Sequence, residues 1–466
     1  MERELIGGIG VILMILLLFM RAPVAFALLG VGWGGVAVLR STSAADAVMS
    51  ADTFGSLLNF DLTTIPSFML MGYIAYAAGF TREVYDAARL LFGRLPGGLA
   101  AASTTGCAAF AAVSGSSLAT AAAMGKIAVP EMIRHGYDKG LATGVVAASG
   151  TLGSLIPPSV LMILYAVFTQ QSIALLFIAG IIPGVLSAGI YIAMILIRAQ
   201  INPSLAPGMK ERIPFREKLR SIKGTWAITL LFIIVMGGIM VGFFTPMEAG
   251  AIGASGAFLI ALAARRLTRE KMGRAFLDTL RQSGSIFAII FGAHVFTRFM
   301  ALSGLGQWLA DIATSYSDQA VPVIIALSVI YIILGTFIGP IEIMLITLPI
   351  VIPVVESYDI SLLWFGIIMI KYLEIGLITP PLGFNVFMIS SVVGKSVPIV
   401  TIFRGVLWFL AMDIVTLALL ISVPAITLFL PDLYTEWMSY LRNSDPEAGQ
   451  AVWLWLTSWT GRANWR

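Results

Sequence analysis

Two short stretches of the chain combine residues that could hold an ion within an apolar segment. Residues 150–159 read Gly-Thr-Leu-Gly-Ser-Leu-Ile-Pro-Pro-Ser, and residues 374–383 read Glu-Ile-Gly-Leu-Ile-Thr-Pro-Pro-Leu-Gly. Because proline has no N–H, each proline pair removes helical hydrogen bonds from the preceding turn. We expect the carbonyls of Gly153, Ser154, Gly376 and Leu377 to lack helical partners and to be able to hold a cation. Ordinary proline kinks are the alternative interpretation.

Composition places these stretches in a membrane protein. The chain has 466 residues, of which 58% are hydrophobic and 12% charged, against roughly 25% charged residues in a soluble domain. Long apolar runs recur, for example at 9–20, 225–242 and 322–334. We therefore predict an all-α polytopic membrane protein embedded in the lipid bilayer. The single cysteine, Cys107, excludes an internal disulfide. The net charge of +4 gives no indication of nucleic-acid binding, because the basic residues lie mainly in loops.

The two stretches belong to a longer internal duplication. The offset from Pro157 to Pro380 is 223 residues, and the same offset aligns Pro130 with Pro353 and Gly153 with Gly376. A nearly constant offset predicts two repeats of one architecture. We place repeat one at 1–200, a cytoplasmic linker at 201–223, repeat two at 224–430 and a tail at 431–466. Chance matching of prolines and glycines in a biased composition is the alternative.

Each repeat is predicted to contain a re-entrant hairpin and a broken helix. The hairpins fall at about 97–132 and 321–355, where small residues or Gly and Pro interrupt the apolar pattern. The helices broken by the proline pairs fall at about 141–168 and 362–391. If the hairpins do not cross the bilayer, each repeat crosses it five times. An odd number of crossings inverts the second repeat relative to the first.

Basic residues provide a separate indication of topology. With the linker in the cytoplasm, most of the 29 lysines and arginines fall on cytoplasmic segments. The amphipathic segment 81–95 carries three arginines, whereas its counterpart at 304–317 carries none. Opposite sides of the membrane explain this difference, and we predict inverted-topology repeats. Three basic residues fall within the membrane region: Lys126, Arg298 and Lys371.

The C-terminal tail is rich in tryptophan. Trp437, Trp453, Trp455, Trp459 and Trp465 all follow residue 430. Tryptophan favours the headgroup layer, so we predict that the tail lies on the membrane surface. A contact with another subunit is the alternative.

Several motifs resemble those of a known transporter family. They are Ser-Gly-Ser-Ser-Leu-Ala-Thr at 114–120, Ile-Ala-Val-Pro-Glu-Met at 127–132, Thr-Pro-Met-Glu-Ala at 245–249 and the two proline-pair stretches, the second continuing to Asn385. Together they resemble the large membrane subunit of tripartite ATP-independent periplasmic (TRAP) transporters. The resemblance implies sodium-driven uptake of organic anions, usually carboxylates, by an elevator mechanism. It also implies a small four-helix membrane subunit, a periplasmic substrate-binding protein and a place in the bacterial inner membrane.

The first hairpin offers a candidate Na⁺ site. Serine hydroxyls and flexible glycine carbonyls are hard oxygen ligands that need no net charge. We assign Ser114 and Gly115, together with Gly150 and Gly153, to this ion site, and we assign Ser116 and Ser117 to the substrate. Close helix packing by small residues is the alternative reading of the motif.

The second hairpin, Leu-Gly-Thr-Phe-Ile-Gly-Pro-Ile-Glu at 334–342, offers a second ion site. We assign Gly335, Gly339, Gly376 and Thr379 to it. Many members of the family carry an aspartate where this chain has Gly339. Glu342, about one helical turn later, either takes over the work of that carboxylate or belongs to a subfamily that does without it.

Two further residues are candidates for substrate contact. An arginine within a membrane span is costly and usually faces a cavity or a partner, and the resemblance implies that Arg298 meets the substrate carboxylate. Snorkelling or a structural salt bridge is the alternative role for Arg298. Asn385 either donates a hydrogen bond to the substrate or stabilises its helix.

The remaining acidic residues and histidines do not indicate an enzyme. Glu131, Glu248, Glu374 and Asp413 lie near or inside spans, and we expect helix capping or charge pairing rather than proton coupling. The chain has two histidines and lacks the His-Glu-x-x-His, Gly-x-Ser-x-Gly and Walker motifs, so we expect neither a hydrolase nor an ATPase. The leading hypothesis is a cation-coupled carrier. Its rivals are a stand-alone sodium–dicarboxylate symporter of similar fold and, from another class, a channel or a membrane enzyme.

Overall fold

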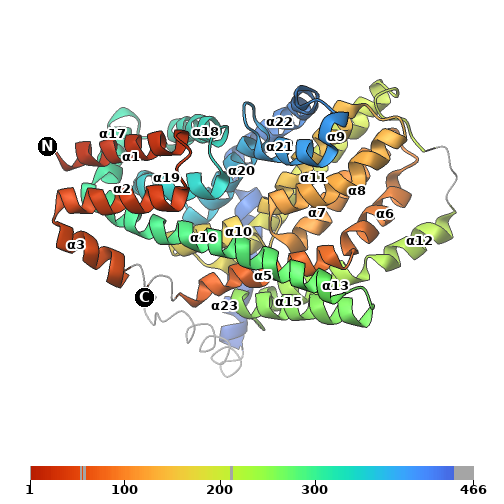
Figure 1. The fold of residues 1–466 in the computed structure, drawn as a ribbon, viewed down its shortest axis with the longest axis horizontal. Helices are drawn as coiled ribbons and strands as arrows, with labels where there is room; N and C mark the ends of the chain where they lie inside the picture. Colours follow the sequence, from red (N-terminus) through yellow and green to blue (C-terminus); the bar gives the residue numbers. More distant parts are fainter. Residues whose placement is uncertain (1, 53–54, 56–58, 210–213, 445–466) are drawn as a thin grey trace.

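The computed structural model describes residues 2–52, 55, 59–209 and 214–444. Every regular element within these ranges is helical, as the composition predicts (Figure 1). The helices of the first part are α1 (Arg3–Phe19), α2 (Val24–Leu39), α3 (Thr42–Ala47), η1 (Val48–Asp52), η2 (Phe60–Thr63), α5 (Thr64–Ala77), α6 (Phe80–Phe92), α7 (Gly98–Ser114), α8 (Ser117–Arg134), α9 (Lys139–Leu155), α10 (Val160–Thr169) and α11 (Ile173–Ile201).

The second part begins with a polar helix in the predicted linker region. Its helices are α12 (Phe215–Gly224), α13 (Trp226–Phe232), η3 (Ile233–Gly237), α14 (Gly238–Val241), α15 (Pro246–Ala263), α16 (Arg269–Ser303), α17 (Leu305–Tyr316), α18 (Ala320–Gly335), α19 (Pro340–Glu356), α20 (Leu362–Ile378), α21 (Phe384–Val393), η4 (Gly394–Ser396), α22 (Ile399–Ser422) and α23 (Ala425–Ser444). The predicted boundary at residue 430 falls inside α23. Trp437 is exposed on that helix, and the other tail tryptophans lie outside the described residues.

Five helices among the described residues are long and apolar enough to cross a membrane. They are the stretch Lys139–Thr169, which contains α9 and α10, and the helices α11, α15, α16 and α22. The apolar helices α2, α7 and α18 are shorter. In the α9–α10 span, 89% of the most apolar window is buried inside the protein, against 33% for α15 and α22. Helix α9 and its neighbour α10 therefore form the centre of the molecule, whereas α15 and α22 present much of their surface outward.

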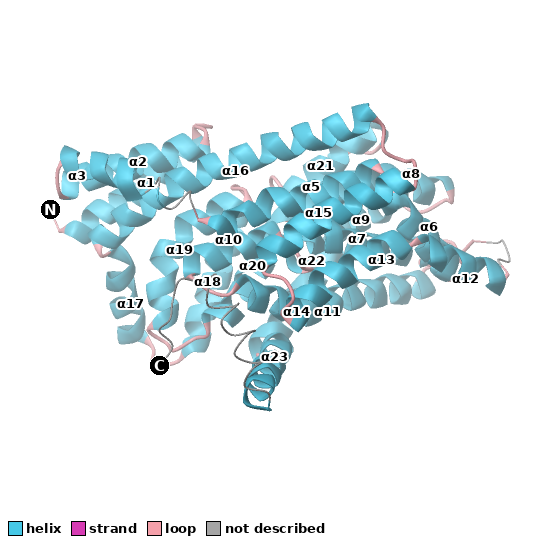
Figure 2. Cartoon of the chain, turned by 90° about the horizontal axis from the view of Figure 1, so that it is seen from below, coloured by secondary structure: helices cyan, strands magenta, loops and turns pink. Residues whose placement is uncertain are grey.

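One helix in each part begins in the same way. Helices α6 and α17 both follow a glycine in the left-handed region, Gly79 with φ 81° and Gly304 with φ 70°. Glycine adopts this conformation without the steric cost of a Cβ atom. Helix α2 packs along α16, and α5 packs along α15. In both views α6 and α17 lie at opposite ends of the long axis of the molecule (Figures 1 and 2).

The helices that carry the proline pairs are the most deeply buried elements. Residues 140–155 of α9 and 364–378 of α20 are buried throughout. Helix α9 consists largely of Gly, Ala, Ser and Thr, which permits close approach of neighbouring backbones. Helices α7, α8 and α22 pack against α9, and α18, α19 and α22 pack against α20. The helices that lead into the two interruptions therefore lie among other helices, and at the first interruption Pro157 and Pro158 are buried as well.

Candidate functional site: two interrupted helices and a pocket

The first interruption lies against the tip of the first hairpin. Helix α9 ends at Leu155 and α10 begins at Val160, while α7 ends at Ser114 and α8 begins at Ser117. The amide of Val160 donates to the carbonyl of Gly115 over 3.1 Å. The hydroxyls of Ser117 and Ser154 share a hydrogen bond of 2.5 Å. The chain thus joins the hairpin tip to both ends of the interrupted helix.

Gly153 lies against the oxygen atoms of the first hairpin tip, whereas Gly150, one turn earlier, packs against the next turn of α8. A Cβ atom built on Gly153 would lie 2.7 Å from the carbonyl oxygen of Ser116, and one on Gly150 would lie 2.8 Å from Ala121. The hydroxyls of Ser114 and Thr120 are 2.8 Å apart, and Thr120 also donates to the Ser116 carbonyl. Hydroxyl and carbonyl oxygens suit a hard cation, so the donor set fits Na⁺.

The second interruption differs in detail from the prediction. Helix α20 ends at Ile378 and α21 begins at Phe384. The amide of Thr379 donates to the Gly376 carbonyl over 3.2 Å. The expectation that this carbonyl lacks a partner is therefore wrong: a tight i→i+3 turn at the helix end supplies a donor. The Thr379 hydroxyl donates to the Ile375 carbonyl over 2.6 Å.

Among the residues assigned to the second ion site, Gly335 and Gly376 contact each other, and Gly339 lies at the start of α19. Gly335 and Gly376 are in direct backbone contact, because a Cβ atom on Gly376 would lie 2.6 Å from Gly335 Cα. At the start of α19, Gly339 lies next to the carboxylate of Glu342. A carboxylate in the first turn of a helix is stabilised by the helix dipole. Glu342 thus lies next to Gly339 at the tip of the second hairpin.

The residues assigned to the substrate do not all gather in one place. Ser116 caps α8 and lines a pocket, whereas Ser117 pairs with Ser154. Asn385 is buried and donates from its amide to the Ala147 carbonyl of α9 over 3.0 Å, an interaction that attaches α21 to α9. Arg298 is exposed on α16, one turn after His294, whose ring stacks on Phe168 at 4.9 Å. The substrate roles of Ser117, Arg298 and Asn385 remain predictions.

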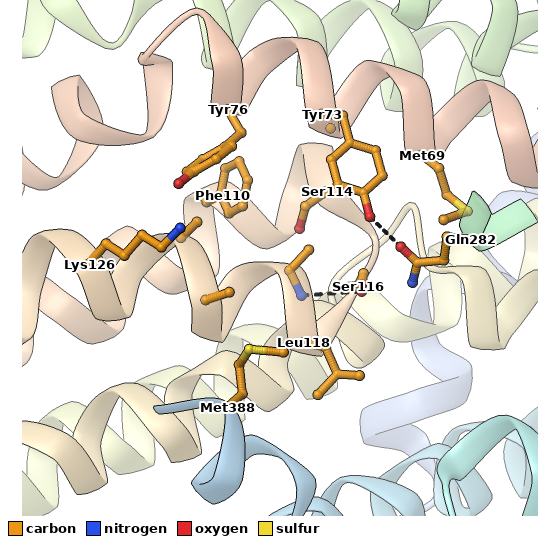
Figure 3. A pocket seen from close by; sticks show the side chains of 14 residues that line it. Met69, Tyr73, Tyr76, Phe110, Ser114, Ser116, Leu118, Lys126, Gln282 and Met388 are labelled. Carbon is orange, nitrogen blue, oxygen red and sulfur yellow. Dashed lines mark hydrogen bonds between the residues drawn. The ribbon is translucent and has the colours of Figure 1, made fainter. Parts of the chain in front are cut away.

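A pocket of about 310 Å³ opens beside the first hairpin. It lies between α5, α7, α8, α16 and α21 (Figure 3). At one end Tyr73 donates a hydrogen bond to Gln282, and at the other lies Lys126. Its lining residues are Met69, Gly72, Tyr73, Tyr76, Phe110, Ser114, Ser116, Leu118, Ala119, Ala122, Ala123, Lys126, Gln282 and Met388.

Sequence reasoning did not assign Lys126, Tyr73 or Gln282 to a site. A signal was present for Lys126, because an ionisable residue within a membrane region is a functional candidate by default. No sequence pattern indicated that Tyr73 and Gln282 contact each other, because they lie 209 positions apart in the chain. Ser114 and Ser116 belong both to the predicted ion cluster and to the pocket lining.

A cluster of buried charges joins helices α11, α20 and α22 near the second interruption. Lys371 of α20 lies 2.6 Å from Asp413 of α22 and 3.1 Å from Glu374, and all three side chains are fully buried. Tyr191 of α11 donates to the same Asp413 oxygen over 2.6 Å. A buried ion pair is tolerated when both charges have hydrogen-bonding partners.

The other two acids are paired or serve as caps. Glu131 lies 2.9 Å from Arg89, and Glu248 forms a capping box with Thr245 at the start of α15. The prediction that the four acids cap helices or pair with charges is thus confirmed.

Solved structures with a similar fold are membrane transporters. The YdaH transporter of Alcanivorax borkumensis matches 80% of this chain and 87% of its own, with a TM-score of 0.54 and 14% sequence identity. The MtrF structure from Neisseria gonorrhoeae, described as one of a class of antimetabolite efflux pumps, matches 82% of this chain and 85% of its own with the same TM-score and identity. The chain therefore shares its fold with these two proteins.

The sequence comparison identifies the family. The family model for the tripartite ATP-independent periplasmic transporter DctM component matches residues 11–426. The C4-dicarboxylate TRAP large permease DctM of Pseudomonas aeruginosa is 36% identical over 376 residues, covering 80% of this chain and 87% of the relative. The sialic acid TRAP large permease SiaM of Vibrio cholerae is 32% identical over 419 residues, covering 90% and 96%.

The chain belongs to this family and is a TRAP transporter large permease, so the resemblance seen in its motifs is confirmed. Family membership implies a multi-pass protein of the inner membrane that works with a small membrane subunit and a periplasmic binding protein. Its relatives are transporter permeases rather than enzymes.

Proposed function

We propose that the chain drives the uptake of an organic anion with Na⁺ and that the anion binds in the pocket beside the first hairpin. One observation carries this proposal: Ser114 and Ser116 lie at the hairpin tip and line the pocket at the same time. A cation held at the tip would therefore be a near neighbour of an anion in the pocket. Two opposite charges about 4 Å apart attract by roughly 4 kcal/mol near a protein surface.

This attraction is large enough to couple the two ligands. Coupling free energies between binding sites are typically about 1–3 kcal/mol. Binding of Na⁺ thus raises the affinity for the anion, and by reciprocity the anion raises the affinity for Na⁺. The second cluster, around Gly335 and Gly376, is our candidate for a second ion.

We further propose that the two repeats are inverted and that transport follows an elevator mechanism. The moving body would contain the two hairpins and the two interrupted helices. The pairs α2–α16 and α5–α15 would belong to the static scaffold. The opposite positions of α6 and α17 along the long axis support the inversion (Figure 1).

The anion would be a carboxylate, because two relatives are named for C4-dicarboxylate and sialic acid. The periplasmic binding protein would deliver it. The small membrane subunit, expected to have four helices, would complete the scaffold. A stand-alone symporter needs neither partner.

Uptake into proteoliposomes tests the proposal. The chain is reconstituted with its small subunit and binding protein, and Na⁺ and H⁺ gradients are imposed separately. We expect saturable uptake that requires the Na⁺ gradient, which a channel would not show. Uptake driven by H⁺ alone would contradict the ion assignment, and full uptake without the binding protein would favour the stand-alone symporter.

A further inference from the structure

Helix α12 carries a stripe of exposed basic residues. Its four basic residues and one acid, Glu217, give the helix a net charge of +3. Arg216, Arg220 and Lys223 are exposed, and residues three or four positions apart lie on the same face of a helix. None of the ion pairs among the described residues involves any of the three. These three residues, the basic stripe, therefore present positive charge to their surroundings.

The basic stripe faces away from the neighbouring helix α6. Lys218 is two positions from both Arg216 and Arg220, which is about 200° around the helix, so it lies on the opposite face. Its ammonium group donates a hydrogen bond over 3.5 Å to the carbonyl of Leu91, near the end of α6. Helix α12 packs along α6, and the two lie at one end of the molecule (Figure 1). The contact with α6 thus uses one face of α12 and leaves the basic stripe on the other.

The next apolar segment places α12 at the membrane surface. The segment Trp226–Val241 follows α12 directly, and its direction differs from that of α12 by 50°. Trp226, its first residue, is 52% exposed. Because tryptophan favours the headgroup layer, the apolar core of the bilayer ends near this residue. Lys223 comes three positions earlier, so the basic stripe lies at the level of the lipid headgroups.

Lipid phosphates are the groups at this level that match the basic stripe in charge. A guanidinium binds a phosphate through two parallel hydrogen bonds. Basic clusters next to a membrane span attract anionic lipids, and each Lys or Arg raises the affinity about fivefold. Three such residues together raise it roughly 100-fold. A soluble acidic protein would have to displace these lipids to reach the basic stripe.

We propose that the basic stripe of α12 binds the phosphate groups of anionic phospholipids. The contact attaches the linker between the two parts of the chain to the membrane surface. This binding site is separate from the pocket and the two interrupted helices. It requires neither Na⁺ nor the transported anion, so it goes beyond the proposed function.

A matched pair of lipids tests the proposal. Phosphatidylglycerol is anionic, and phosphatidylcholine with the same acyl chains has no net charge. Each lipid is titrated into the full chain purified in detergent with its small subunit, and bound lipid is measured by native mass spectrometry. We expect the first phosphatidylglycerol to bind roughly 100-fold more tightly than phosphatidylcholine. Because salt screens exposed charges, the preference should decrease as the ionic strength is raised before the measurement.

Variants of the basic stripe test whether these residues cause the preference. The triple variant Arg216→Gln, Arg220→Gln and Lys223→Gln should lose the preference for phosphatidylglycerol, about fivefold for each residue. The triple variant Arg216→Lys, Arg220→Lys and Lys223→Arg keeps all three charges and should retain most of it. Thermal unfolding shows whether each variant is folded, and the comparison of the two lipids on the wild-type chain needs no variant.

A control variant separates the basic stripe from the net charge of the protein. Arg3→Gln, Arg40→Gln and Lys395→Gln together remove the same charge from exposed positions outside α12. This control should bind phosphatidylglycerol as the wild type does. An equal loss in the control and in the glutamine variant of the basic stripe would overturn the proposal.

Four further results would overturn the proposal. Two of them are equal affinities for the two lipids and an unchanged preference in the folded glutamine variant. Displacement of phosphatidylglycerol by glycerol 3-phosphate at similar concentration would assign the basic stripe to a free phosphate anion. Binding of polyglutamate at the basic stripe in preference to phosphatidylglycerol would assign it to an acidic protein. The outcome does not depend on Na⁺-driven uptake, so failure of the proposed function would leave this inference standing.

Discussion

Adding a methyl group at Gly376 would separate the second hairpin from the interrupted helix α20. In the structure, a Cβ atom at this position would lie 2.6 Å from Gly335 Cα and 2.9 Å from the Gly335 carbonyl oxygen. Both neighbours are backbone atoms, so no side-chain rotation relieves the clash. The two backbones must move apart by about 0.8 Å, the gap between 2.6 Å and the 3.4 Å of ordinary contact.

The expected cost follows from this displacement. Overpacking of a well-packed interior typically costs about 1–3 kcal/mol. Coordination distances at a metal site tolerate shifts of only about 0.2 Å. If Na⁺ binds between these backbones, Gly376→Ala should therefore weaken Na⁺ binding. If this cost of about 1–3 kcal/mol raises the free energy of the Na⁺-bound state alone, the affinity for Na⁺ decreases roughly 5- to 150-fold.

The assay is the Na⁺ dependence of uptake into proteoliposomes at a fixed substrate concentration, with thermal unfolding measured alongside. Gly335→Ala should act similarly, because its Cβ atom would lie 2.8 Å from Gly376 Cα. The double variant should cost less than the sum of the two, since both substitutions strain one contact. Gly189→Ala in α11 is the control, because apart from the local backbone of its own helix no atom lies within 4 Å of its added methyl group. A Na⁺ titration of folded Gly376→Ala that superimposes on wild type would refute the reasoning.

Two stability predictions concern buried and capping groups. Lys371→Met leaves Asp413 and Glu374 buried without their cation and should destabilise the protein by about 3–5 kcal/mol. Chemical unfolding in detergent measures this loss, and a triple variant that also carries Asp413→Asn and Glu374→Gln should recover most of it; equal stability of the single and triple variants would contradict the electrostatic explanation. Thr245→Ala removes the capping box with Glu248 and should cost about 0.5–2 kcal/mol by the same measurement. Thr245→Ser preserves the hydroxyl, so a loss as large as that of alanine would rule out the cap as the cause.

The interruptions in the helices follow from local chemistry and could be predicted from sequence. A proline pair removes two N–H donors wherever it occurs. The all-helical class likewise follows from composition alone. The Gly376 carbonyl shows the limit of this reasoning: proline removes its helical donor, but the Thr379 amide reaches it through a tighter turn. Which turn forms depends on the packing around the helix end, and the sequence pattern does not contain that information.

The positions of polar side chains depend on packing between distant helices. Lys371 and Asp413 are 42 residues apart, and their contact requires α20 and α22 to be adjacent with a particular rotation. The orientation of Asn385 toward Ala147 has the same origin. Sequence reasoning could place each residue on a helix, but it could not determine which neighbouring helix that face would contact. For this reason Lys126 was recognised as an intramembrane charge without being assigned to a pocket.

The two interruptions are alike in sequence but differ in their surroundings. Pro157, Pro158 and Ser159 are buried, and the carbonyl of Gly115 at the hairpin tip accepts a hydrogen bond from the first residue of α10. Residues 380–382 are exposed, and the second hairpin reaches the interrupted helix α20 before the proline pair, through the contact of Gly335 with Gly376. The first site is therefore closed by its hairpin, whereas the second is open at the proline pair. Because an ion leaves a closed site only when the covering contact breaks, we expect Na⁺ to exchange more slowly at the first site than at the second.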